Sequence, residues 1–280
     1  MEQLYKINGE EIVVQFEETA DMVEGISQVL SSGETDLTHG LDWYSQGHTS
    51  QPLFSEQEFS SIRDGVSNAV QSLLKKEGIN TEGFKLEQYH NYVTDDLHYK
   101  VVGQTRDLFP EDFNFDCEAI HARLGNILHT PLTDINPLTG KKLHIIVRIN
   151  RPQSTDYNPV HKDIYQAYDG RNEIPQFVNF WIPICGVTPK SSLPVASGSH
   201  LIQEDKIVRT AAGSVINGNA YRVNSILSWN GSTELQRPKV DYGSVLVFSP
   251  HLIHGLASNL ENNATRVSLE FRLFKAPVVG

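Results

Sequence analysis

A histidine and a carboxylate, His161 and Asp163, stand two positions apart in the stretch 158–165. They follow the apolar run 143–149, which has the composition of a strand. If pairing continues past Pro159, side chains at positions i and i+2 point to the same face, so the two groups project together. Imidazole and carboxylate groups together are common metal ligands. The pair therefore predicts two-thirds of a metal site, while an aspartate that caps a backbone N–H in a surface turn is the alternative interpretation.

A third ligand is available far along the chain, in the stretch 249–255, which contains His251 and His254. The residues themselves leave the choice between these two histidines open. The chain then alternates like a strand over 265–271, where Arg266 and Ser268 share a face. Two histidines and one carboxylate with open positions are the arrangement of non-haem Fe(II) oxygenases. A planar guanidinium can bind the distal carboxylate of an iron-bound 2-oxoglutarate.

The ordered set of His161-x-Asp163, a downstream His-Gly and Arg266-x-Ser268 resembles the Fe(II)/2-oxoglutarate-dependent dioxygenases. The segment 180–189 and the tripeptide 198–200 resemble the phytanoyl-CoA dioxygenase-like branch, and the likeness covers residues 143 to 275. It implies Fe(II) ligands at His161, Asp163 and His254, because Gly255 and Asn259 follow His254.

His251 is then expected to be a hydrogen-bond partner that orients a ligand. The resemblance further implies that Arg266 and Ser268 bind the 2-oxoglutarate carboxylate. Arg272, six positions later and of the same parity, is the alternative to Arg266.

Further residues are expected near this site. Asn179 and Trp181 share one face of a strand, and since Asn is depleted in strands we predict an inward polar contact to 2-oxoglutarate, with Trp181 beside it. Arg148, Tyr165 and Gln166 lie near the ligands in sequence and are predicted to contact substrate, with a structural role as the alternative.

The charge composition of the chain limits which classes of binding partner are expected. The 280 residues carry 34 acidic and 23 basic side chains, a net charge of -11, without a basic cluster. A nucleic-acid backbone needs a basic surface, so we expect no such partner. The acidic balance favours a polar metabolite, a sugar-like acid or an amino-acid derivative over a highly anionic acyl-CoA.

Cellular location follows from similar arguments. No apolar stretch approaches the ~20 residues of a membrane span, and the first residues lack a secretory pattern. Two isolated cysteines, Cys117 and Cys185, do not suggest a disulfide framework, so a reducing cytoplasm is expected. Oligomeric state stays open.

Helical patterns occupy the N-terminal half. Ser55 and Glu58 form a capping box before a helix predicted over 56–77. Other expected elements are a hairpin over 4–16 with an Asn-Gly turn, helices over 21–30 and 113–128, a loop over 33–54 and a strand over 89–93.

After residue 141 the apolar residues recur at every second position, which is the period of a strand. Strands are predicted over 143–149, 177–184, 221–227, 243–249 and 266–274. Helices followed by antiparallel strands predict a mainly β protein with flanking helices and a double-stranded β-helix, the jelly-roll or cupin-like core. We expect one domain, 1–280, with a mainly helical flank over 1–140, the core over 141–275 and an insertion over 201–242 that covers the site.

The resemblance implies a hydroxylase that consumes O2 and 2-oxoglutarate, releases succinate and CO2 and oxidises an unactivated C–H of a small molecule. Related halogenases leave the carboxylate position vacant for halide, so the presence of Asp163 favours hydroxylation. A cupin-like metal- or sugar-binding jelly-roll without oxygenase activity is the alternative. Such proteins have no reason to place Arg-x-Ser a dozen residues after the last ligand.

Overall fold

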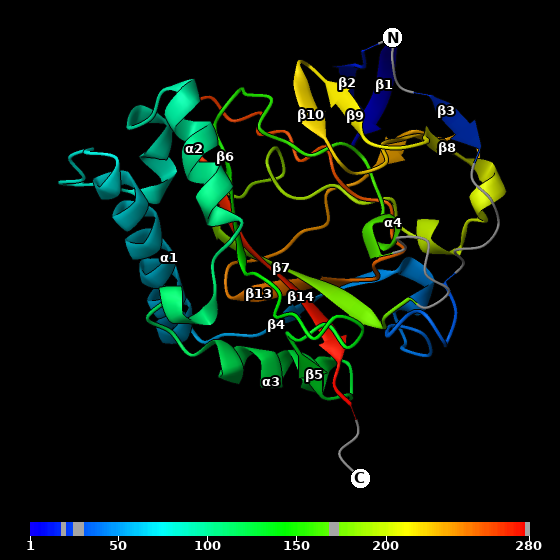
Figure 1. Ribbon diagram of the computed structural model, residues 1–280, viewed down its shortest axis with the longest axis horizontal. Helices are drawn as coiled ribbons and strands as arrows, with labels where there is room; N and C mark the ends of the chain where they lie inside the picture. The colour runs from blue at the N-terminus through cyan, green and yellow to red at the C-terminus, as the bar shows by residue number, and fades with distance from the viewer. Residues whose placement is uncertain (18–20, 25–30, 168–173, 278–280) are drawn as a thin grey trace.

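A six-stranded antiparallel sheet forms the centre of the molecule in the computed structural model, which describes residues 1–17, 21–24, 31–167 and 174–277 (Figure 1). Four strands follow one another in the order β4, β13, β7 and β14, and both β5 and β6 pair with β14. Their bounds are β4 His48–Pro52, β5 Leu132–Thr133, β6 Ile146–Asn150, β7 Phe177–Cys185, β13 Ser244–Phe248 and β14 Arg266–Lys275. The strands predicted over 143–149, 177–184, 243–249 and 266–274 are thereby confirmed.

Alternation along β14 separates two faces of this sheet. Val267, Leu269 and Phe271 belong to the main hydrophobic core, which also contains side chains of the helices. The opposite face, here called the inner face, carries the β14 side chains Arg266, Ser268, Glu270 and Arg272. Because β14 has neighbours on both sides, its register sets which groups of β6 and β7 stand beside these four.

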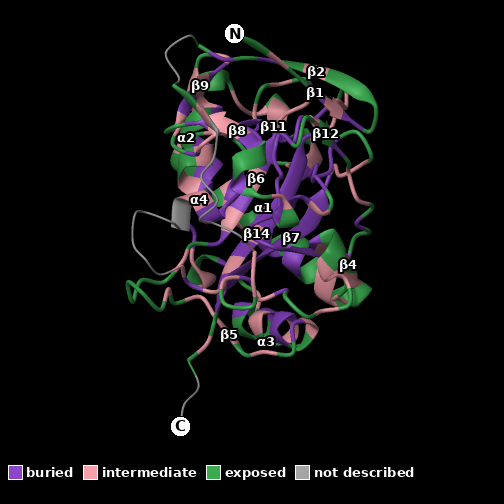
Figure 2. Ribbon diagram, turned by 90° about the vertical axis from the view of Figure 1, so that its right-hand side faces the viewer, coloured by how far each residue is buried: buried purple, intermediate pink, exposed green. Residues whose placement is uncertain are grey.

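Three helices pack on the other face of the sheet. They are α1 Glu56–Lys76, α2 Asp95–Thr105 and α3 Cys117–Ile127. The capping box predicted for α1 is present, since Ser55 N–H donates to Glu58 Oε2 at 2.9 Å and Glu58 N–H donates to Ser55 Oγ at 3.3 Å. Figure 2 shows the buried strands at the centre of the molecule, with α3 near its lower end.

Shorter sheets form a second layer around their own core. The hairpin predicted over 4–16 is confirmed as β1 Glu2–Ile7 and β2 Glu10–Gln15, and β12 Glu234–Leu235 pairs with β1. β3 Met22–Glu24, β8 Ile207–Thr210 and β11 Ile226–Trp229 make another sheet, and β9 Ser214–Ile216 pairs with β10 Asn219–Tyr221. The segment 201–242 is thus built into this layer. The sheets are not closed into a barrel, and the overall arrangement is mainly β with flanking helices, as expected.

Several local predictions were wrong. Residues 22–24 of the expected helix form β3, because they pair with β8, and residues 25–30 lie outside the described part. The expected strand over 89–93 begins instead inside a 3-10 helix, Leu86–Asn91. The expected loop over 33–54 ends in β4, which pairs with β13, so the main sheet also draws strands from the region 1–140.

Other boundaries shifted. The predicted strand 221–227 is divided between β10 and β11, and α2 was not predicted. The remaining short helices are α4 Ile164–Ala167 and the 3-10 turns Tyr44–Gln46, Pro110–Asp112, Ser199–Leu201 and Glu204–Lys206. Within the described residues, no helix combines the length and the apolar character needed to cross a bilayer.

Candidate metal centre

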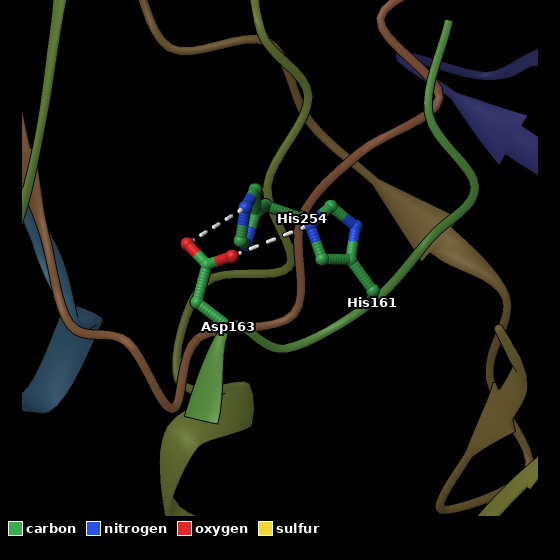
Figure 3. A group of neighbouring side chains, drawn as sticks. All are labelled: His161, Asp163 and His254. Atoms are coloured by element: carbon green, nitrogen blue, oxygen red, sulfur yellow. Dashed lines mark ion pairs between the residues drawn. The ribbon is translucent and has the colours of Figure 1, made fainter. Parts of the chain in front are cut away.

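His161, Asp163 and His254 converge, although 93 positions separate the first from the last (Figure 3). Their ligand atoms lie within 4.8 Å of one another and all three residues are buried. Asp163 Oδ1 is 3.5 Å from His161 Nε2, and Asp163 Oδ2 is 3.6 Å from His254 Nε2. Cis ligands about 2.1 Å from an octahedral ion stand about 3 Å apart. The three side chains therefore need to move only slightly to share one ion.

Two backbone hydrogen bonds bring the ligand segments together. His161 N–H donates to the His254 carbonyl at 2.8 Å, and His254 N–H donates to the His161 carbonyl at 3.0 Å. Gly255 follows with a φ of 127°, and a Cβ there would lie 2.2 Å from the Pro159 carbonyl oxygen. The glycine after His254 is therefore required by the close approach of the two segments.

Both imidazoles are oriented by their other nitrogen. His161 Nδ1 lies 2.7 Å from the Pro159 carbonyl, and His254 Nδ1 lies 3.0 Å from the Leu252 carbonyl. A carbonyl only accepts, so Nδ1 carries the proton and Nε2 presents its lone pair. Burial, with His161 nearby, lowers the pKa of His254 to about 4. His254 is therefore neutral at physiological pH, as a metal ligand must be.

Arg272 pairs with the carboxylate of the triad. Its Nη2 lies 2.6 Å from Asp163 Oδ1. Burial alone would raise the pKa of Asp163, but Arg272 and the two histidines outweigh burial and hold it well below its ordinary value. Asp163 is therefore ionised, and Arg272, considered above as an alternative carboxylate binder, lies instead beside Asp163 of the candidate triad.

Arg266 lies fully buried on the same face. Its Nε donates to the Ser191 carbonyl at 3.0 Å, and its Nη1 donates to Asn150 Oδ1 at 2.7 Å and to Ser268 Oγ at 3.2 Å. Its Nη2 has no hydrogen-bond partner among the described residues. Burial lowers the pKa of Arg266 to about 9, which still leaves it positively charged at neutral pH. A buried charged group with a free donor needs an anionic partner.

Two more buried donors of the inner face are unpaired. Asn179 Nδ2 and Trp181 Nε1 lack partners within the described part of the chain. In the sheet register Asn179 stands opposite Arg272, and Trp181 stands opposite Glu270. The Trp181 ring centroid is 5.5 Å from the Arg266 guanidinium carbon. An oxygen-rich dicarboxylate such as 2-oxoglutarate fits this set of unpaired donors, and two histidines with a carboxylate fit Fe(II).

Comparison with known proteins decides the family. The model of the phytanoyl-CoA dioxygenase (PhyH) family matches residues 48–267. The chain belongs to this family. It is accordingly an oxygenase-type enzyme, with iron and 2-oxoglutarate as its cofactors. No curated protein matched the chain.

Solved structures show distant similarity to this family member. The non-heme alpha ketoglutarate dependent carbocyclase SnoK from nogalamycin biosynthesis is 16% identical, with 88% of each chain covered and a TM-score of 0.42. EvdO2 from Micromonospora carbonacea var. aurantiaca, complexed with 2-oxoglutarate, is 15% identical over 85% of this chain and 89% of that chain, with a TM-score of 0.49. The epimerase SnoN, complexed with Fe3+, alpha ketoglutarate and nogalamycin RO, is 13% identical over 84% and 81%, with a TM-score of 0.43. Likeness at this level does not transfer a reaction or a substrate.

Sequence reasoning missed an acidic partner of Arg148. Glu270 accepts from Arg148 Nε at 3.0 Å and from Arg148 Nη2 at 2.8 Å, so the pair is bidentate. Burial would raise the pKa of Glu270, and Arg148 outweighs it so that the pKa is lowered. The signal was available, because Glu270 has the same parity as Arg266 and Ser268.

Other predicted residues are not in the group of candidate ligands. Tyr165 donates to Glu204 Oε2 at 2.6 Å, and Glu204 also forms a buried ion pair with Lys162 at 2.8 Å. The side chain of Gln166 is outside the described residues. His251 is fully buried but is not in the metal-ligand group, which contains His254.

A surface cavity of about 780 Å³ lies elsewhere, between α3 and β5. His121 lines it, and the ring of this histidine meets Phe271 of β14 edge to face. Phe271 belongs to the face of β14 opposite the inner face, so this cavity is on the helix side of the sheet. No member of the triad lines it.

Proposed function

We propose that this family member hydroxylates an unactivated C–H of a small molecule, with His161, Asp163 and His254 as the Fe(II) ligands. Arg266 and Ser268 bind the distal carboxylate of 2-oxoglutarate in this proposal. The observation that supports it is the buried Arg266, whose Nη2 has no partner among the described residues. Arg266 lies on the same inner face that meets the triad through Arg272.

In this proposal three residues bind the metal, and neighbouring groups set the orientation and charge of those ligands. The His161 and His254 rings keep their lone pairs on Nε2 because the carbonyls of Pro159 and Leu252 hold the Nδ1 protons. Asp163 stays ionised beside Arg272. When bound, iron and 2-oxoglutarate supply the oxidation of the C–H with O2, yielding succinate and CO2.

Arg266 orients the co-substrate. Its guanidinium is fixed on two sides by Ser191 and Asn150, so the free Nη2 points in one direction. Asn179 and Trp181 add two donors beside it. Burial of all three residues keeps water from these hydrogen bonds, which strengthens them.

The carboxylate at position 163 supports hydroxylation over halogenation, because it occupies the coordination position that a halide would need. Burying the charged Arg266 with no anionic partner costs several kcal/mol. A sugar-binding or metal-binding jelly-roll that catalyses no reaction would gain nothing in return for this cost.

Anaerobic titration with Fe(II) and 2-oxoglutarate tests the proposal. We expect a visible metal-to-ligand charge-transfer absorbance that saturates at one equivalent of iron, and succinate formation on exposure to O2. Arg266→Gln should require more 2-oxoglutarate to reach the same absorbance. A protein that binds iron with no charge-transfer band at saturating 2-oxoglutarate would contradict it and support the binding-protein alternative.

A further inference from the structure

Arg266 differs from Arg148 and Arg272 in the charge of its partners. Arg148 forms a bidentate ion pair with Glu270, and Arg272 pairs with Asp163. Arg266 is fully buried, yet it pairs with no carboxylate among the residues that the structure describes. The positive charge of Arg266 is therefore still available to a ligand.

Neutral oxygens accept the hydrogen bonds that Arg266 makes. Its Nε donates to the Ser191 carbonyl at 3.0 Å, and its Nη1 donates to Asn150 Oδ1 at 2.7 Å and to Ser268 Oγ at 3.2 Å. The bond to Asn150 is the shortest of these. Such acceptors fix the plane of the guanidinium without cancelling its charge, and Nη2 has no partner in the described part of the chain.

Asn150 stands between a group that only donates and a group that only accepts. It is the last residue of β6, lies opposite Arg266 in the sheet register and is 1% exposed. Its Oδ1 accepts from Arg266, and its Nδ2 donates to the Asp156 carbonyl. An amide satisfies both neighbours. An ionised aspartate would place an oxygen against the Asp156 carbonyl and would cancel the charge of Arg266.

The Asp156 carbonyl is held in place by its own neighbours. The Asp156 carboxylate accepts from Arg151 N–H at 3.0 Å and from Arg151 Nε at 2.8 Å, and it lies 3.1 Å from His98 Nε2. The side chains of Asp156 and His98 are each 2% exposed. Asn259 Nδ2 donates to the Asn150 carbonyl at 3.0 Å. These contacts hold the Asn150 amide with Oδ1 toward the guanidinium.

We propose that Asn150 determines the selectivity for a dicarboxylate co-substrate, because it holds Arg266 through a neutral acceptor. The guanidinium is oriented by Asn150 and keeps the full charge that binds the distal carboxylate of 2-oxoglutarate. Asn150 acts through Arg266 and is a positioning residue. This assignment rests on the proposed function and deepens it, since it names the group that positions a buried arginine without neutralising it.

The probe for the distal carboxylate is 2-oxopentanoate, which has the 2-oxo acid end of 2-oxoglutarate and a methyl group in place of the second carboxylate. Each compound is titrated anaerobically into the Fe(II)-loaded protein at mildly alkaline pH, and its Kd is obtained from the charge-transfer absorbance. Both compounds share the chelating end, so the ratio of the two Kd values reports the distal carboxylate alone. We expect the wild type to bind 2-oxoglutarate about 10- to 150-fold more tightly than 2-oxopentanoate.

Asn150→Asp and Asn150→Ala separate the charge of the acceptor from its presence. Asn150→Asp keeps an oxygen toward Arg266, but a carboxylate beside a guanidinium is ionised and cancels its charge, so the Kd ratio should fall to about one. Asn150→Ala removes the acceptor and leaves the charge, so the ratio should fall only about threefold, as for one lost hydrogen bond. A merely structural role predicts the opposite order, because aspartate is the closer replacement in shape.

Asn259→Asp is the matched control. Asn259 is 1% exposed, and its Nδ2 donates to the carbonyls of Asn150 and Ala264. Asn259→Asp therefore also sets an oxygen against carbonyl oxygens, but Asn259 makes no hydrogen bond to Arg266 among the described residues. We expect the two Kd values to change together in this variant and their ratio to match the wild type. A ratio as low as in Asn150→Asp would assign the effect to disturbed packing and overturn the proposal.

The two Asn150 variants decide the proposal. A Kd ratio in Asn150→Asp that equals or exceeds the ratio in Asn150→Ala overturns it, and so does a wild-type ratio in Asn150→Ala. Co(II) affinity without co-substrate, together with chemical denaturation, shows whether Asn150→Asp folds. If it does not fold, Asn150→Ala decides alone, since a ratio lowered about threefold at unchanged Co(II) affinity supports the proposal and an unchanged ratio overturns it.

Failure of the underlying function has a different signature, because it appears in the wild type. If no charge-transfer band forms with either compound, the oxygenase proposal fails. If the band forms but the wild type binds both compounds equally well, Arg266 does not bind the distal carboxylate, and the role of Asn150 fails with it. A wild type that prefers 2-oxoglutarate, with variants in the wrong order, removes Asn150 alone.

Discussion

The two ends of the inner face are built differently. At the metal end, His161 and His254 lie outside the named strands and are joined by an isolated bridge, with His161 N–H and His254 N–H each donating to the other's carbonyl. At the other end, Arg266 begins β14, which pairs with β6 and β7 on its two sides. The proposed metal end therefore depends on a few specific contacts, whereas the proposed co-substrate end depends on the register of the main sheet.

These two kinds of construction predict different effects when a residue at either end is substituted. Ion pairs hold the metal end, with Arg272 on Asp163 and, on the other side of the segment, Lys162 on Glu204. Backbone pairing and buried packing hold the co-substrate end. Substitutions at the metal end should change metal affinity or stability. Substitutions at the co-substrate end should change the affinity for 2-oxoglutarate.

Asp163→Ala should have the largest effect. Removing the carboxylate deletes one ligand and leaves Arg272 without its acidic partner, so we expect metal-dependent hydroxylation to be abolished. Metal affinity, measured with Co(II) by absorbance, and succinate formation report the two losses separately. Full 2-oxoglutarate turnover in this variant would remove Asp163 from the ligand set.

Lys162→Met should affect stability next most strongly. Lys162 and Glu204 are each 1% exposed, and breaking a buried pair by removing one partner costs about 3–5 kcal/mol. The double variant Lys162→Met/Glu204→Gln keeps an acceptor for Tyr165 and should recover most of the loss in chemical denaturation. If the double variant is no more stable than Lys162→Met, the pair does not anchor the ligand segment.

Arg266→Gln should weaken 2-oxoglutarate binding and leave metal binding unchanged. A hydrogen bond to a charged group contributes about 1.5–3 kcal/mol, so the Kd for 2-oxoglutarate should rise about 10- to 150-fold. Co(II) affinity in the absence of 2-oxoglutarate should match the wild type. A variant that loses metal affinity to the same degree as co-substrate affinity would show that the ends are not independent.

Arg272→Gln should weaken metal binding and leave 2-oxoglutarate binding unchanged, and this is the smallest effect that we expect. Loss of a group that orients a ligand lowers metal affinity about 10- to 100-fold. The apparent KM for 2-oxoglutarate, measured at saturating iron, should remain near the wild-type value. A raised KM with unchanged Co(II) affinity would return Arg272 to the role of carboxylate binder.

Local patterns predicted the elements with strong short-range signals. The Asn8-Gly9 turn, the Ser55 and Glu58 capping box and the alternation over 266–274 each depend on residues only a few positions apart, and each element formed. The expectation for 21–30 failed, because residues 22–24 found a strand partner in β8, almost two hundred positions away. The spacing of residues within a short segment carries no information about pairing with a strand so far away in the sequence.

The sequence by itself determined which chemistry is available: a histidine and a carboxylate two positions apart, a later His-Gly, and an arginine and a serine of equal parity. It also established that Arg266 and Arg272 share a face, because the period of a strand is a property of the local backbone. The family resemblance selected His254 rather than His251, and the structure brings His254 to His161 and Asp163. Only the tertiary structure decided that Arg272 pairs with Asp163 and that Arg148 pairs with Glu270. These choices depend on which distant segments lie within a few ångströms of one another, and that follows from the packing of the whole chain.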